Sequence, residues 1–66
     1  MVPQLDDEPR LLVDAHHVAA ALDLPLSWVR AKTREGELPS VALGTYRRYA
    51  LDDVRRWVET RKEGGR

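Results

Sequence analysis

The side chains best suited to chemistry in this 66-residue sequence are the arginines of its middle part. Arg30 and Arg34 are four residues apart, which places them on one face of a helix, and Arg47 and Arg48 follow as a pair. A guanidinium group can donate two parallel hydrogen bonds to the O6 and N7 of guanine, and it also binds phosphate oxygens. The pattern by itself fits two alternatives, a face that contacts DNA and an ordinary solvated face.

Other polar residues give weaker signals. His16 and His17 are adjacent, so on a helix they point about 100° apart and cannot bind one metal ion together. Asp52 and Asp53 are better explained as helix caps than as a catalytic pair. The sequence has no glycine-rich phosphate loop, nucleophile signature or cysteine. We therefore expect a binding protein without catalytic residues, metal, cofactor or small-molecule substrate.

Length and composition narrow the choice further. A folded chain of this size buries only about 60% of its unfolded surface, which leaves room for one modest core and no deep cavity. No apolar run approaches the roughly 18 residues of a membrane span, and the first ten residues do not resemble a secretory signal. We expect a cytoplasmic protein with no membrane partner.

The formal net charge is zero, which at first argues against a nucleic-acid partner. The charges are unevenly distributed, however. Residues 1–25 carry one basic and five acidic side chains, residues 26–49 carry five and two, and residues 50–66 carry five and four. Any contact with DNA bases should therefore come from the basic middle segment.

The arginines must be positioned by short elements. We expect a helix over 15–22 with Asp14 as its N-cap. Its inward face should carry Ala15, Val18, Ala21 and Leu22. Pro25 can open a second helix over 26–35, in which Val29 points inward with Leu26 and Thr33. The outward residues are then Ser27, Arg30, Ala31 and Arg34. Two helices joined by so short a turn must cross, which is the helix-turn-helix arrangement.

The second half should form a hairpin and a third helix. Gly36 is placed to stop the second helix in the left-handed conformation. Residues 38–43 and 46–50 read as strands joined by a turn at Gly44 and Thr45. Asp52 or Asp53 should cap the third helix, whose inward stripe is Val54, Trp57, Val58 and Arg61, with Trp57 as the largest part of the core.

The expected fold class is therefore mainly α with a small β-hairpin. The elements follow in the order helix, turn, helix, hairpin, helix. We expect one domain over 11–62, flanked by disordered tails at 1–10 and 63–66.

The run from residue 12 to residue 58 resembles the winged helix-turn-helix domain of the excisionase and MerR-like families of small bacterial and phage DNA-binding proteins. The matching positions are Val18-Ala19, Leu22 to Pro25, Trp28-Val29, Arg34 to Pro39, Leu43-Gly44, Arg48-Tyr49, Asp53-Val54 and Trp57-Val58. Three features depart from the family pattern: the pair His16-His17, Lys32 at an often apolar position, and the neutral Thr45 after the turn glycine.

The resemblance implies that the second helix enters the major groove of DNA and that the hairpin is a wing. Ser27, Arg30, Ala31 and Arg34 would then face the bases, with Trp28 and Lys32 beside them near phosphates. In the wing, Thr45, Tyr46 and Arg47 would reach the duplex, with Arg47 suited to a narrow minor groove. Two residues have structural alternatives. Trp28 can instead pack under a neighbouring element, and Arg48 can either contact phosphate or bridge to an acidic group such as Glu35.

The function that the resemblance implies is that of an excisionase-type architectural protein in the nucleoid of a bacterial host cell. Such a protein binds double-stranded DNA near attachment sites, cooperatively with further copies, bends it, and directs a phage integrase toward excision. One alternative is a small MerR-like transcriptional regulator, which the few residues after Trp57 disfavour. Another is a protein-interaction adaptor, whose binding would lack the steep salt dependence of a DNA contact.

Overall fold

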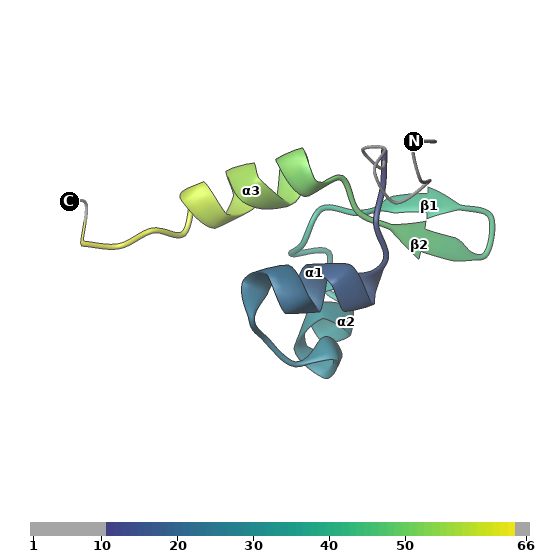
Figure 1. Cartoon of the computed structure of the whole chain (residues 1–66), viewed down its shortest axis with the longest axis horizontal. Coiled ribbons are helices and arrows are strands. Elements are labelled where there is room, and N and C mark those ends of the chain that lie inside the picture. Colours follow the sequence, from purple (N-terminus) through teal and green to yellow (C-terminus); the bar gives the residue numbers. More distant parts are fainter. Residues whose placement is uncertain (1–10, 65–66) are drawn as a thin grey trace, which may run out of the picture.

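The computed structural model describes residues 11–64, which form three helices and one two-stranded antiparallel hairpin (Figure 1). The elements are α1 (Ala15–Leu22), α2 (Leu26–Arg34), β1 (Val41–Leu43), β2 (Tyr46–Arg48) and α3 (Leu51–Glu59). This is the mainly helical, winged helix-turn-helix order that the sequence predicts. The predicted tails at 1–10 and 65–66 lie outside the described residues, whereas Glu63 and Gly64 follow α3 as exposed residues.

Helix α1 begins as predicted. The Asp14 carboxylate accepts a hydrogen bond from the backbone N–H of His17 at 3.0 Å and so satisfies one free donor of the first turn. The inward face differs from the prediction, because Ala19 is buried and Ala21 is exposed. The stripe formed by residues 15, 18, 19 and 22 is centred between Val18 and Ala19, and Ala21 lies about 110° from its middle. The prediction for Ala21 is therefore wrong.

Helix α2 follows α1 after three residues, and the extended backbone of Pro25 opens it. Val29 is completely buried, as the helical pattern predicts. Gly36 has φ +79° and ends the helix: its N–H donates to the Thr33 carbonyl at 3.0 Å, and the Glu37 N–H donates to the Lys32 carbonyl at 2.9 Å. This pair of bonds is the Schellman arrangement, in which glycine avoids the steric cost of a Cβ.

The hairpin is shorter than the sequence suggests. Its three residue pairs are Val41 with Arg48, Ala42 with Arg47, and Leu43 with Tyr46. Gly44, at φ +63°, supplies the positive dihedral angle that the two-residue turn requires. The predicted strand over 38–43 begins only at Val41, because Pro39 has no N–H for a strand ladder and the Leu38 N–H is bonded to the Lys32 carbonyl.

The predicted returning strand over 46–50 is also shorter, since β2 ends at Arg48. Tyr49 pairs instead with Val13, through backbone hydrogen bonds of 2.9 and 2.8 Å, and this bridge attaches the hairpin to the segment before α1. Ala50 is the N-cap of α3 and makes no side-chain capping bond. The prediction of an aspartate cap is wrong, because the helix begins at Leu51 and places Asp52 and Asp53 in its first turn. There the two carboxylates favourably oppose the positive end of the helix dipole.

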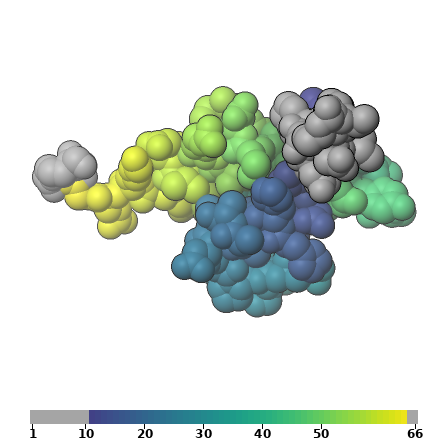
Figure 2. Space-filling view, in the orientation of Figure 1, coloured from purple at the N-terminus to yellow at the C-terminus, as the bar shows by residue number. Residues whose placement is uncertain are grey.

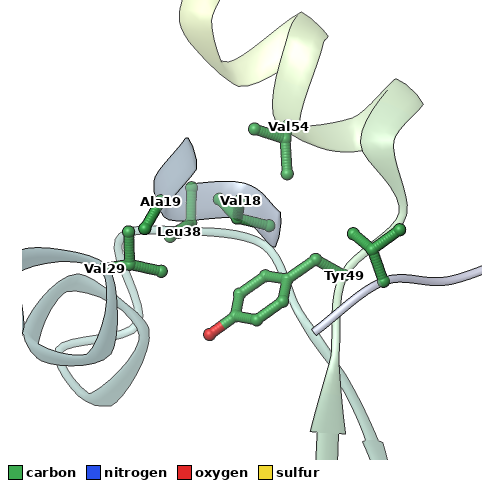
Figure 3. Packing of buried hydrophobic residues seen from close by; sticks show 7 residues of the cluster. Val18, Ala19, Val29, Leu38, Tyr49 and Val54 are labelled. Carbon is green, nitrogen blue, oxygen red and sulfur yellow. The ribbon is translucent and has the colours of Figure 1, made fainter. Parts of the chain in front are cut away.

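The core gathers side chains from every helix and from the segments just before and just after the hairpin (Figure 3). Its buried members are Val13, Val18, Ala19, Val29, Leu38, Tyr49 and Val54. Tyr49 is the largest of the fully buried side chains, whereas Trp57 is only half-buried. The prediction that Trp57 supplies the largest part of the core is therefore wrong. Tyr49 stands at the link between hairpin and α3, where α1 and α2 enclose it, while the Trp57 ring meets Trp28 at the edge of the core.

Within residues 11–64, no helix combines the length and the apolar character needed to cross a bilayer.

Candidate nucleic-acid interface

A groove of about 480 Å³ opens between α2, β2 and the beginning of α1. We call it the arginine groove, and its lining residues are Asp14, Ala15, His16, Arg30, Thr33, Arg34, Arg47, Arg48 and Tyr49. The four arginines singled out from the sequence thus meet around one cavity, although two belong to a helix and two to a strand. Periodicity gave no reason to include Asp14, His16, Thr33 or Tyr49, since their part in the groove depends on how the elements pack.

The groove has two sides, one formed by arginines of α2 and the other by arginines of β2. Arg30 and Arg34 are one helical turn apart on α2, so they project from the same side of it. Arg47 and Arg48 lie on β2, and its continuation, Tyr49, is anchored in the core. The position of the wing relative to α2 therefore depends on how Tyr49 is held.

A hydrogen-bond chain joins Tyr49 to α2. The Thr33 hydroxyl lies 2.8 Å from the Val29 carbonyl, to which it donates, and 2.5 Å from the Tyr49 hydroxyl. Since the single Thr33 proton is used on the carbonyl, the Tyr49 hydroxyl must donate to the Thr33 oxygen. The wing and α2 are thus tied together directly beneath the arginines.

The arginines of the groove differ from the other cations of the molecule. Within residues 11–64, five Lys and Arg side chains form ion pairs with carboxylates, four of them three residues apart on or beside a helix. These five are Lys32, Arg55, Arg56, Arg61 and Lys62. No ion pair of the described residues includes a groove arginine. The free positive charge of the described chain is therefore concentrated around this groove.

Two of the groove arginines make neutral contacts that orient them. Arg47 donates to the Ser40 hydroxyl at 3.2 Å, and Arg48 donates to the Arg47 carbonyl at 2.9 Å. The Arg48 guanidinium also lies 5.3 Å from the centroid of the Tyr46 ring, a cation–π contact. The alternative in which Arg48 bridges to Glu35 does not occur in the structure, where Glu35 pairs with Lys32 at 3.3 Å.

Asp14 is the carboxylate that lines the groove. The hydrogen bond from the His17 backbone N–H lowers the pKa of Asp14 below its ordinary value, and the charges of His16 and Arg48 act in the same direction. Asp14 therefore stays ionised at neutral pH and adds one negative charge to the lining of the groove, although it forms no ion pair with the four arginines.

The other residues predicted to contact DNA lie outside the arginine groove. Ser27 is exposed on the first turn of α2, Ala31 is half-buried, and Thr45 and Tyr46 lie at the exposed end of the wing. Trp28 and Lys32 lie on the side of α2 that faces α3: the two tryptophan rings meet edge to face at 6.2 Å, and Lys32 Nζ is 5.7 Å from the Trp28 centroid. This contact favours the packing alternative for Trp28.

Within residues 11–64, His, Asp and Glu side chains form no group of three that could hold a metal ion. The geometry is that of an open, cationic surface, suited to binding an extended anion.

One comparison with known proteins gives a match. A family model described as a helix-turn-helix domain matches residues 12–62. No curated protein and no solved structure matches the chain.

Proposed function

Since the chain belongs to the helix-turn-helix domain family, we propose that it is an excisionase-type architectural protein that binds and bends double-stranded DNA. Membership of the family itself indicates DNA binding. The finer role, in which several copies load side by side and direct an integrase toward excision, is our proposal for this chain.

The observation that carries the proposal is the arginine groove. Four guanidinium groups from two elements meet there without a carboxylate partner among the described residues, whereas the cations of α3 are paired. An unpaired cationic groove beside a helix-turn-helix attracts the phosphate backbone, and contacts to phosphates supply most of the affinity for DNA. A solvated charged face would not require arginines of a helix and a wing to converge.

In the proposed complex, α2 lies in the major groove. Arg30 and Arg34 reach guanine edges, while Ser27 and Ala31 lie along the same approach to the bases. Arg47 and Arg48 bind the adjacent backbone from the wing. The remaining proposed contacts come from Lys32 at the flank of α2 and from Thr45 and Tyr46 at the end of the wing, while Trp28 keeps its packing contact with Trp57.

The small size of the domain supports cooperative loading. A single module of this kind buries only about 600–1,000 Å² against DNA, which is too little for tight binding by one copy. Further copies on adjacent sites would supply the missing affinity. We propose that the protein does no chemistry, and that an integrase catalyses the strand exchange, in the bacterial cytoplasm where the DNA lies.

The test is a titration on DNA that the protein itself selects from a random duplex pool. In a gel-shift titration we expect the protein to bind cooperatively to duplexes that carry two or more adjacent sites. In a fluorescence energy-transfer assay it should bring the two labelled DNA ends closer together. Arg30→Ala combined with Arg34→Ala should abolish selection, while Arg55→Ala combined with Arg56→Ala, a matched change on α3, should not.

A single non-cooperative complex on unbent DNA would contradict the architectural role. The direction of recombination is then tested by adding the integrase that is encoded nearest to the gene. The protein should raise the yield of excised product and not that of the integrated product.

A further inference from the structure

The wing ends in an apolar surface that the arginine groove does not use. Leu43 and Tyr46 are 49% and 64% exposed, and the informative feature is that the two lie together rather than singly. They are a cross-strand pair that directly flanks the Gly44-Thr45 turn, so they lie on the same face at the end of the hairpin. Figure 1 shows that the hairpin projects beyond the helices, and the space-filling view in Figure 2 shows the same projection.

We propose that Leu43 and Tyr46 form an apolar wedge that enters the minor groove of DNA and partly unstacks one base step. This inference rests on the proposed function and adds the means by which the DNA is bent. Proteins that kink DNA from the minor groove insert apolar side chains between base pairs in this way, and the duplex bends toward the major groove.

The size and the surroundings of the wedge fit this partner. Only the two side chains at the tip, and not the whole two-stranded ribbon, would enter the minor groove, which is about 6 Å wide. Leucine is a common wedge residue, and the Tyr46 ring offers a flat face against which an unstacked base can lie.

Charge complementarity also favours DNA over an apolar protein partner. Immediately behind the wedge, Arg47 and Arg48 extend the wing toward the arginine groove, and the Arg48 guanidinium lies over the Tyr46 ring. Two cations at the base of an apolar tip are placed to bind the phosphates on either side of an opened step. Insertion there would also remove Leu43 and Tyr46 from water, which offsets part of the cost of unstacking.

The experiment compares wild-type protein with Leu43→Ala/Tyr46→Ala on a selected duplex. The DNA carries fluorophores at its ends, which report the bend, and 2-aminopurine at successive positions, which brightens where a base is unstacked. Leu11→Ala is the matched control, since it also removes an exposed leucine side chain, 90% exposed, but lies outside the wing and the proposed DNA contacts. Because Leu43 and Tyr46 are exposed, the double variant should keep its fold, and circular dichroism checks this.

We expect the double variant to bind with affinity reduced less than tenfold and with unchanged salt dependence, while the bend and the 2-aminopurine signal are lost. Leu11→Ala should retain both signals. An unchanged bend in the double variant, or wild-type binding without a bright step, overturns the wedge and leaves the DNA-binding proposal standing. If wild-type protein binds no duplex, both proposals fail.

Discussion

Arg34 and Arg56 are both exposed arginines on helices, but their surroundings differ. Arg34 lines the arginine groove and has no carboxylate partner within residues 11–64, whereas Arg56 lies 2.6 Å from the Asp53 carboxylate on α3. We predict that Arg34→Ala weakens binding to the selected duplex by about 1–3 kcal/mol and relaxes the base preference at one position. Arg56→Ala should change neither quantity.

The measurement is fluorescence anisotropy with the selected duplex and with single-base variants of it. Equal losses for Arg34→Ala and Arg56→Ala, on selected and random DNA alike, would place the readout on another surface.

The two tyrosines of the wing allow a second comparison at this scale. Tyr49 is buried and donates its hydroxyl proton to Thr33, whereas Tyr46 is exposed. We predict that Tyr49→Phe lowers the free energy of unfolding by about 1 kcal/mol, because a partly buried hydrogen bond is lost. Tyr46→Phe should leave it unchanged. Urea titration followed by circular dichroism measures both, and equal stability of the two variants would contradict the role assigned to the Thr33–Tyr49 bond.

At the scale of the elements, α1 depends on its cap. The pKa of Asp14 is lowered in the folded chain, first by the His17 backbone N–H, so its carboxylate stabilises the fold at any pH above its unfolded value of about 3.9. That contribution is lost as the pH falls through the lowered value. We predict that Asp14→Ala reduces the melting temperature at pH 7 and that the gap to wild type narrows below about pH 4.

Asp14→Asn is the control, because asparagine caps a helix but carries no charge. It should retain most of the stability at pH 7, and it should bind DNA more tightly because it removes the carboxylate of the groove. A gap between wild type and Asp14→Ala that stays constant down to pH 2 would show that the charge of Asp14 does not support the helix.

The end of α2 depends on backbone conformation alone. Gly36 has φ +79°, and a Cβ added there would meet no heavy atom within 4 Å. We predict that Gly36→Ala destabilises the fold by about 1 kcal/mol, since an L-residue adopts this conformation at a cost, and that Gly36→Asn costs less. Thermal denaturation of the two variants measures both losses of stability. Steric clash is not the cause, so a larger loss for asparagine than for alanine would contradict this explanation.

The sequence predicts the elements where the signal is local. Asp14, Val29 and Gly36 act as expected, because an N-cap, an inward apolar residue and a left-handed stop depend on their immediate neighbours. Two local predictions also failed, since Ala19 rather than Ala21 is buried in α1 and α3 begins at Leu51, before the expected aspartate cap.

The other failures concern contacts between distant segments. The bridge from Val13 to Tyr49 joins residues 36 positions apart, and no periodicity indicates it. That bridge takes Tyr49 out of the strand and places it, rather than Trp57, at the centre of the core.

The candidate site follows the same division. Helical spacing places Arg30 and Arg34 on one face, and the turn at Gly44 places Arg47 and Arg48 in the wing. Their convergence depends on the Thr33–Tyr49 hydrogen bond and on the bridge from Tyr49 to Val13, which only the assembled structure reveals.

At the scale of the whole molecule, the zero net charge hides two populations of cations. The lysine and arginines after residue 50 within the described chain are paired with nearby carboxylates, and the groove arginines are not. The electrostatic field far from the protein is therefore weak, while the field close to the arginine groove is strong. A protein of this kind gains little from non-specific attraction, and its affinity depends on how well the groove fits a particular duplex.

The central claim is that the arginine groove binds the phosphate backbone of duplex DNA. Its most direct test is the affinity for the selected duplex, measured by anisotropy between 50 and 300 mM salt. If Arg47 and Arg48 contact phosphates while Arg30 and Arg34 read bases, the two wing arginines should contribute about −1.8 to the log–log slope of affinity against salt, and Arg47→Ala should make that slope shallower by about one. Binding that is independent of salt, or a slope that Arg47→Ala leaves unchanged, would contradict the account.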